Sequence, residues 1–130
     1  MKIGLIREGK TPPDKRVPFT PKQIRRILEL YPNEIEFKVE PSPIRCFSDD
    51  EFAGLDIELS QDMSDCDVLM GIKEVPIDQL IPQKTYIFFS HTIKKQAHNK
   101  KLLQVVLKKN IKLIDYEVLK NEKGERTVAF

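Results

Sequence analysis

Long apolar segments are lacking in this sequence of 130 residues, and cysteine is scarce. No run approaches the roughly 18 apolar residues of a membrane-spanning helix. Only four residues separate Lys2 from Arg7 at the N-terminus, too few for the core of a signal peptide. Cys46 and Cys66 have neither a CxxC spacing nor a neighbouring histidine pair, which disfavours a zinc site or a redox motif. We therefore expect a cytoplasmic protein without metal or membrane partner, and with two reduced, partly buried thiols.

An excess of charge of one sign is also lacking. Charged residues make up 32% of the sequence but leave a formal net charge of only +2, so no overall field attracts nucleic acid or an anionic membrane. A lysine-rich segment could still bind nucleic acid. Its lysines are Lys94, Lys95, Lys100, Lys101, Lys108 and Lys109. Because they surround more than half of a predicted helix and have no interleaved aromatic residues, a solvated helix face is favoured and no nucleic-acid partner is expected.

The first part of the sequence predicts a strand, a loop and a helix. Residues 2–7 form a short apolar run, and the Gly and Pro residues that follow predict a loop. Thr20 and Pro21 predict a helix start, with the hydroxyl as N-cap and the proline in the first turn. Apolar side chains then recur at helical spacing until Pro32 ends the helix.

Strands predominate in the middle of the sequence. Residues 34–40 alternate apolar and charged side chains, which predicts a strand with one solvated face near a sheet edge. Ser48 and Glu51 match a capping box and predict a short helix. Later apolar runs without alternation are typical of parallel strands covered on both faces. These runs are residues 67–72, 85–89 and 111–114.

A helix is predicted over residues 93–110, between the last two of these strands. Its expected apolar stripe consists of Leu103, Val106 and Leu107. His98 is expected on its surface and Asn110 at its end. Residues 125–130 form a further strand-like run. The order of the elements predicts a single α/β domain of three layers, in which helices flank a largely parallel sheet.

Polar side chains follow every strand predicted to lie inside this sheet. In open parallel sheets, the loops after the strands converge at one edge, where ligands bind, so these residues are expected to face one crevice. They are Arg7, Lys10, Lys15, Arg16, Lys73, Glu74, Ser90, His91, Thr92, Asp115, Tyr116 and Glu117. The set suits a small molecule that carries a carboxylate and undergoes proton transfer. Arginine can bind a carboxylate through two N–H groups, while lysine and histidine can exchange protons. Taken singly, a histidine at a strand end is more often structural, and a Lys–Glu pair is usually solvated.

Four stretches occur in an order and spacing typical of a known family. They are IGLIREGKTPPDKRVPFTP (3–21), DVLMGIKEVP (67–76), FFSHTIKKQAHNKKLL (88–103) and LIDYEVLKNEKGERTVAF (113–130). Together they resemble the N-terminal domain of the alanine dehydrogenase and pyridine nucleotide transhydrogenase superfamily over nearly the whole chain. FFSHT combined with LIDYE is most similar to the branch of lysine-forming saccharopine dehydrogenase and lysine-oxoglutarate reductase.

This resemblance implies a Rossmann-like or flavodoxin-like substrate domain of an enzyme that uses NAD or NADP to oxidise or reduce a carbon bearing nitrogen. In the saccharopine branch, that carbon belongs to the imine joining the lysine amine to 2-oxoglutarate. The resemblance implies that Arg16 holds a substrate carboxylate and that Lys73 and His91 are the acid-base pair. Lys94 matches a further basic position at the substrate site. Two acidic positions that tune the charge of the pair match Glu74 and Glu117.

The sequence differs from the complete enzymes of this family because it lacks a nucleotide-binding motif. No GxGxxG follows a predicted strand, because the five glycines are scattered, so the phosphate-binding turn of a dinucleotide domain is absent. Residues 1–130 are therefore expected to be an N-terminal substrate domain, inactive alone, excised from a longer chain that carries the NAD(P)-binding domain. Surface exposed by truncation makes a homodimer plausible. The alternatives are an alanine-dehydrogenase-like domain and a non-catalytic module that binds a small amino acid or 2-oxo acid.

Overall fold

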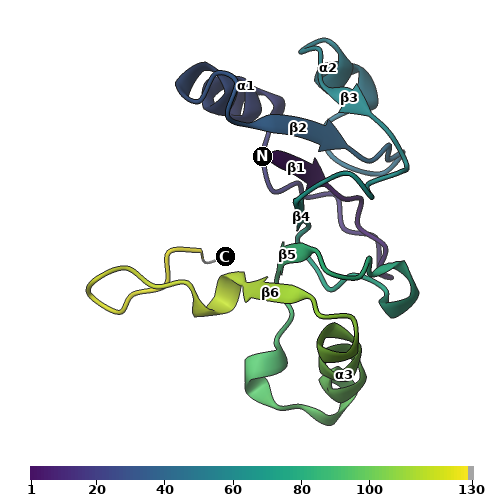
Figure 1. Cartoon of the computed structure of the whole chain (residues 1–130), viewed down its shortest axis with the longest axis vertical. Helices are drawn as coiled ribbons and strands as arrows, with labels where there is room; N and C mark the ends of the chain where they lie inside the picture. Colours follow the sequence, from purple (N-terminus) through teal and green to yellow (C-terminus); the bar gives the residue numbers. More distant parts are fainter. Residues whose placement is uncertain (129–130) are drawn as a thin grey trace.

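The computed structural model describes residues 1–128, in which helices cover both faces of a six-stranded sheet (Figure 1). The strands are β1 (Lys2–Leu5), β2 (Glu36–Val39), β3 (Glu58–Leu59), β4 (Val68–Met70), β5 (Thr85–Phe88) and β6 (Lys112–Asp115). All pair in parallel, in the order β3-β2-β1-β4-β5-β6. The helices are α1 (Pro21–Leu30), α2 (Asp49–Ala53) and α3 (Lys100–Lys108), with single 3-10 turns η1 (Ile77–Gln79), η2 (Thr92–Lys94), η3 (Ala97–Asn99) and η4 (Tyr116–Val118). The predicted α/β fold with a parallel sheet is confirmed.

Capping boxes begin the first two helices, at Thr20, which the sequence predicts as an N-cap, and at Ser48, where it predicts the box itself. The Thr20 hydroxyl accepts a hydrogen bond from the Gln23 N–H (3.2 Å), and the Gln23 side chain accepts one from the Thr20 N–H (2.8 Å). Ser48 and Glu51 make the same reciprocal pair before α2. These bonds satisfy N–H groups that have no partner inside the helix, so each helix starts at a defined residue. Within residues 1–128, no helix is long and apolar enough to cross a bilayer.

Two apolar clusters lie on opposite faces of the sheet. Met70 of β4 packs in the cluster that contains Ile24 of α1, whereas its neighbour Leu69 packs in the cluster that contains Leu102 of α3. Successive side chains of a strand point to opposite faces, so this division shows that both faces are buried. In Figure 1, α1 and α2 flank the half of the sheet that contains β1 to β3, and α3 lies beside β6. The three layers are confirmed.

The side on which the chain adds new strands to the sheet changes between β1 and β4. These two strands are neighbours, but the chain continues from β1 towards β2 on one side and from β4 towards β5 on the other. The loops that follow them, residues 6–20 and 71–76, therefore diverge at the carboxyl edge of the sheet. Such a switch point leaves a crevice between the loops.

The helix predicted over residues 93–110 is wrong in its first half. Two 3-10 turns, η2 and η3, replace it, and α3 begins only at Lys100. Lys95, between the two turns, has a left-handed backbone (φ 52°) that an α-helix cannot contain. His98 is exposed, as expected, although it lies in η3. Asn110 adopts φ 51° just after the helix, which is the predicted end.

The predicted apolar stripe of this helix is correct at Val106 and wrong at Leu103 and Leu107. Leu102 and Val106 are the buried pair of α3, whereas Leu103 and Leu107 are exposed. Residues four apart lie on one face of a helix, so burial of Leu102 selects Val106 and turns Leu103 and Leu107 away from the sheet. The apolar pattern alone contains both pairs and does not distinguish them.

The strand predictions are wrong in part. In β2, Glu36 is solvated as predicted, but Lys38 on the same face is buried where Glu58 and Asp65 receive its ammonium group. β2 lies next to the edge of the sheet, and the edge itself is β3, which at two residues is too short to show a pattern. No strand occurs within residues 125–128, where Arg126 makes only an isolated antiparallel bridge to Lys120. The remainder of that predicted run, residues 129–130, lies outside the described residues.

Both thiols are free, but neither is partly buried. Cys46 is exposed, and Cys66 is completely buried in the cluster beneath α3. Burial raises the pKa of the Cys66 thiol to about 11, because a thiolate is poorly solvated there. Cys66 therefore acts as a small apolar core residue.

Candidate functional site

The carboxyl edge of the sheet carries a crevice of about 500 Å³ between the loops that follow β1, β4, β5 and β6. The crevice lies where the order of strands predicts a binding site. Most of the residues that line it carry ionisable side chains. The lining residues are Lys10, Arg16, Lys73, Glu74, Phe89, His91, Glu117, Arg126 and Val128. Six of them were expected there from the sequence. Lys94, also expected at the site, does not line the crevice but contacts Glu117, which does.

Arg16 is held at one wall of the crevice by Asp14. Its Nε lies 2.9 Å from Asp14 Oδ1 and its Nη2 lies 2.6 Å from Oδ2, and its backbone N–H also donates to Oδ1. Hydrogen bonding to Arg16 lowers the pKa of Asp14 to about 2, so the carboxylate stays charged at neutral pH. The Arg16 side chain is nevertheless 42% exposed and lines the crevice, so it is fixed in place while still facing solvent.

Lys73 and Glu74 follow β4 and line the crevice. The Lys73 Nζ lies 3.8 Å from Asp14 Oδ2, so the carboxylate that holds Arg16 also faces this amine. Glu74 pairs with Lys10 across the switch point (3.0 Å). Ion pairs between cations and carboxylates thus connect the loops after β1 and β4.

His91 lies where the chain leaves β5, in a left-handed backbone conformation (φ 54°). This conformation is uncommon for residues other than glycine and persists only when neighbours enforce it. Asn99 donates to the His91 carbonyl (3.2 Å), and the buried Ser90 hydroxyl donates to Asp115 (2.6 Å). The strained turn directs the imidazole into the crevice, where it lies near the ring of Phe89.

Glu117 organises the opposite wall. Its side chain is only 7% exposed, and its Oε2 lies 3.0 Å from His91 Nδ1. Oε1 lies 3.1 Å from Lys94 Nζ and 3.3 Å from Arg126 Nη2. Hydrogen bonds from His91 and Lys94 hold the pKa of Glu117 below its ordinary value, so it accepts the hydrogen on Nδ1. The other imidazole nitrogen, Nε2, is then the one that can exchange a proton with a ligand.

Several expected residues do not face the crevice. Arg7 turns towards Glu40 (Nε to Oε1, 3.3 Å), away from the site, and Lys15 is exposed. Tyr116 packs in the core, where burial raises its pKa to about 12. The others support the walls from beneath through hydrogen bonds. These are Ser90, Thr92 and Asp115.

Three carboxylate or guanidinium groups at the site were not found from the sequence. Asp14 precedes Arg16 by two residues, the spacing that allows both backbone and side-chain bonds, and this was the available clue. Glu8 accepts hydrogen bonds from the N–H groups of Ile72 and Lys73, a contact between distant segments that no local pattern reveals. Arg126 lay in a run that was interpreted as a strand.

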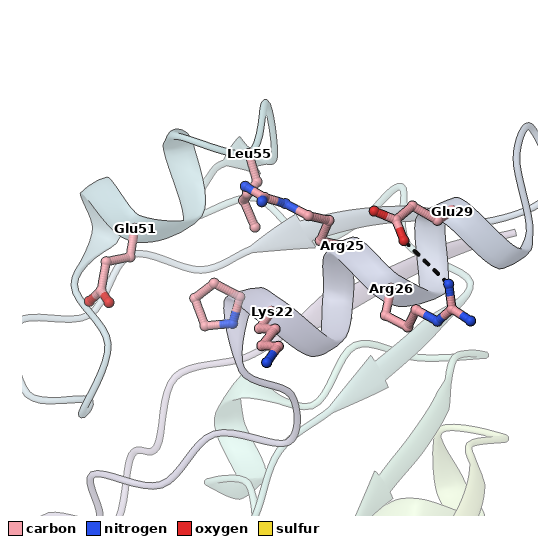
Figure 2. A pocket seen from close by; sticks show the side chains of 7 residues that line it. Lys22, Arg25, Arg26, Glu29, Glu51 and Leu55 are labelled. Carbon is pink, nitrogen blue, oxygen red and sulfur yellow. Dashed lines mark hydrogen bonds and ion pairs between the residues drawn. The ribbon is translucent and has the colours of Figure 1, made fainter.

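A second hollow, of about 530 Å³, lies between α1 and α2 (Figure 2). Arg26 at its rim pairs with Glu29 (3.5 Å), and Glu51 is engaged in the capping box of Ser48. Arg25 extends towards Leu55 across the opening. These contacts belong to surface pairing and helix capping, so the crevice at the carboxyl edge is the candidate site.

The glycines of the chain do not build a phosphate site. Gly4 allows close packing, since a Cβ there would lie 2.7 Å from Leu69, and a Cβ on Gly9 would lie 2.9 Å from Pro76. The N–H groups beside the switch point already bind Glu8. A dinucleotide pyrophosphate therefore does not fit the described residues in the way it fits a glycine-rich turn. No cluster of at least three potential metal ligands occurs within residues 1–128.

Comparison with known proteins shows the family of this chain. The transhydrogenase from Sinorhizobium meliloti has the same fold, with a TM-score of 0.73 over 93% of this chain and 36% of that one, at 13% identity. Mitochondrial alpha-aminoadipic semialdehyde synthase of Bos taurus is 38% identical over 128 residues, which are 98% of this chain and 14% of that protein. Saccharopine dehydrogenase (NAD(+), L-lysine-forming) of Yarrowia lipolytica is 31% identical over 135 residues, covering 100% of this chain and 36% of that protein.

The chain thus spans only a small part of the curated relatives it matches. The resemblance inferred from four sequence stretches is confirmed, including its lysine branch, because relatives of that branch match almost the whole chain. The family model for the alanine dehydrogenase/PNT N-terminal domain matches residues 4–130. The chain belongs to the alanine dehydrogenase/PNT N-terminal domain family.

Proposed function

We propose that this chain is the substrate-binding domain of an oxidoreductase that acts on a carbon–nitrogen bond with NAD or NADP. One observation carries the proposal: Arg16, fixed by Asp14, shares a crevice with Lys73 and with His91, itself fixed by Glu117. Relatives named for saccharopine dehydrogenase favour saccharopine, in which lysine is joined to 2-oxoglutarate, as the substrate.

Arg16 binds a substrate carboxylate in this proposal. Asp14 orients the guanidinium and keeps its own charge at neutral pH, so the arginine is already aimed before the substrate arrives. Lys94 and Arg126 share Glu117 on the opposite wall and supply cationic groups for a second carboxylate. A dicarboxylic 2-oxo acid suits a crevice that presents cations on two walls.

Lys73 and His91 exchange protons with the substrate. When an amine adds to a 2-oxo acid, the nitrogen must lose a proton, and the hydroxyl that departs as water must gain one. One member of the pair accepts the first proton and the other donates the second, and the two exchange roles in hydrolysis. Glu117 keeps His91 Nε2 available by holding Nδ1, and Glu74 and Asp14 set the negative charge around the Lys73 side of the crevice.

The nicotinamide nucleotide is proposed to bind outside residues 1–130. The described residues do not form a dinucleotide phosphate site, and the curated relatives are much longer than this chain. No hydride step is therefore assigned to any residue of this chain, which binds the substrate and moves protons. Residues 1–130 form one substrate domain in this proposal, and its homodimer stays a prediction.

The test is an assay of the complete native protein that contains these residues. We expect it to oxidise NADH or NADPH with lysine plus 2-oxoglutarate, faster than with pyruvate plus ammonia. Preference for pyruvate and ammonia contradicts saccharopine as substrate but keeps the reaction class. If no substrate pair supports nucleotide oxidation while 2-oxoglutarate still perturbs the crevice residues in NMR spectra, the chain is a non-catalytic binding module and the proposed enzyme function is wrong.

A further inference from the structure

Glu8 joins the two loops that diverge at the switch point. Its Oε1 accepts a hydrogen bond from the Ile72 N–H (2.6 Å), and its Oε2 accepts one from the Lys73 N–H (2.9 Å). On the other side, the Ile72 carbonyl accepts from the Phe89 N–H (2.9 Å). The main chain that carries Lys73 is therefore fixed between β5 and a side chain from the loop after β1.

This contact replaces sheet pairing where the sheet ends. The last hydrogen bond between β1 and β4 runs from the Ile6 N–H to the Met70 carbonyl (3.0 Å), after which the two segments separate. Gly71 leaves room for the carboxylate, since a Cβ there would lie 3.3 Å from Glu8 Oε1. Two backbone N–H groups without a strand partner are thus satisfied by one side chain.

We propose that Glu8 is a positioning residue, which fixes the Lys73 main chain and so sets the placement of the Lys73 amine beside Asp14 and Arg16 for proton transfer. The inference rests on the proposed function of Lys73. Glu8 does not line the crevice, so it acts through Lys73 rather than on the substrate. The loop that holds the carboxylate-binding Arg16 and the loop that holds the proton-exchanging Lys73 become one rigid unit.

The charge of Glu8 serves both loop contacts at a cost in solvation. Burial raises the pKa of Glu8, which means that the ionised form is less favourable here than in water, although both backbone hydrogen bonds favour it. Asp14 opposes and Arg16 favours its charge. A neutral glutamine avoids the desolvated charge but offers only one acceptor to two N–H groups. Glu8→Gln should therefore lose one of the two loop contacts, and the N–H group left without an acceptor offsets what the neutral side chain gains in solvation.

The test compares Glu8→Gln with Glu8→Asp and with the control Glu29→Gln, whose carboxylate is on the exposed surface of α1. In the complete protein, Glu8→Gln is expected to lower kcat by about tenfold or more, because a misplaced catalytic group loses rate steeply. The KM for the 2-oxo acid should change less, since Arg16 remains. Glu8→Asp keeps the charge and should recover part of kcat, while Glu29→Gln should leave it unchanged.

NMR of the amide groups of Ile72 and Lys73 supplies a readout independent of turnover. Both signals should shift, and their hydrogen exchange should accelerate, in Glu8→Gln but not in Glu29→Gln. An unchanged kcat, or unshifted amide signals in an active variant, overturns the positioning role and leaves the proposed function standing. If the wild-type protein is inactive with every substrate pair, the proposed function is wrong. Shifted amide signals in Glu8→Gln would still establish the contact between the loops.

Discussion

Two clusters of charged residues illustrate different uses of ion pairing in this domain. The Lys38 cluster consists of Lys2, Lys38, Glu58 and Asp65, and the crevice lies at the carboxyl edge of the sheet. The Lys38 ammonium uses all three hydrogens, on Asp65 (2.7 Å), Glu58 (2.9 Å) and the Asp62 carbonyl (3.2 Å). Within residues 1–128, the Lys73 ammonium makes only a 3.8 Å ion-pair contact, with Asp14.

The ammonium group of Lys38 is fully paired within the fold, whereas the ammonium group of Lys73 has hydrogens left over that could bind a ligand. Asp65 raises the pKa of Lys38, and Lys2 lowers that of Asp65, so the cluster stabilises its own ionised groups. In the crevice, carboxylates orient cations but leave part of their surface exposed, as at Arg16. Substitutions in the crevice should therefore change activity, and substitutions in the Lys38 cluster should change stability.

His91→Gln should produce the largest change. Glutamine retains polarity but cannot exchange a proton, so turnover of the complete protein is expected to fall by about a hundredfold or more, with thermal unfolding almost unchanged. Steady-state kinetics and a melting curve measure the two quantities. His98→Gln is the matched control, because His98 is exposed outside the crevice. Normal turnover in His91→Gln with normal nucleotide binding would remove this residue from the mechanism.

Arg16→Ala should mainly weaken substrate binding. Loss of a charge-assisted pair to a carboxylate costs roughly 1.5 to 3 kcal/mol, so the KM for the 2-oxo acid should rise by about tenfold to a hundredfold. Lys22→Ala, on the exposed surface of α1, serves as the control. An unaltered KM contradicts the carboxylate role of Arg16 and would shift that role to Lys94 or Arg126.

Lys38→Met tests the other side of the comparison. Methionine fills a similar volume but leaves Lys2 as the only cation of the cluster for Asp65 and Glu58, and these carboxylates are half exposed, which limits the cost. The midpoint of thermal unfolding should fall by about 5 °C, while kcat and KM stay unchanged. A loss of activity at unchanged stability would show that the Lys38 cluster communicates with the crevice and would end the distinction between the two.

The fold could be predicted because its signals are local. Capping boxes at Thr20 and Ser48 and apolar runs at the buried strands are properties of neighbouring residues. The start of α3 could not be predicted, because Lys95 leaves the helical conformation within an otherwise helical sequence pattern. The partners of Lys38 are equally hidden, since Asp65 lies far along the chain and only the sheet brings it near.

The site could be predicted as far as strand ends determine it. Arg16, Lys73, His91 and Glu117 meet because each follows a strand of one parallel sheet. Arg7 follows β1 as well, but its side chain leaves towards Glu40, and position in the chain does not specify that direction. The role of Glu8 could not be predicted either, because its partners are backbone N–H groups of a distant loop, which leave no recognisable pattern in the sequence.

The smallest expected effect is a change in the pKa of single carboxyl groups, and it distinguishes the crevice from the Lys38 cluster most directly. Hydrogen bonding to Arg16 lowers the pKa of Asp14 from an ordinary 3.8 to about 2, so this pair contributes stability above pH 3.8 that is lost as the pH falls through about 2. NMR titration of the Asp14 carboxyl carbon should show that midpoint, and Arg16→Ala should return it towards 3.8. The low pKa of Asp65 should not move in Arg16→Ala but should rise in Lys38→Met, which in turn should leave Asp14 unchanged. Movement of both carboxyl groups in either variant would mean that the two clusters share one field across the sheet, and their separation into stability and chemistry would fail.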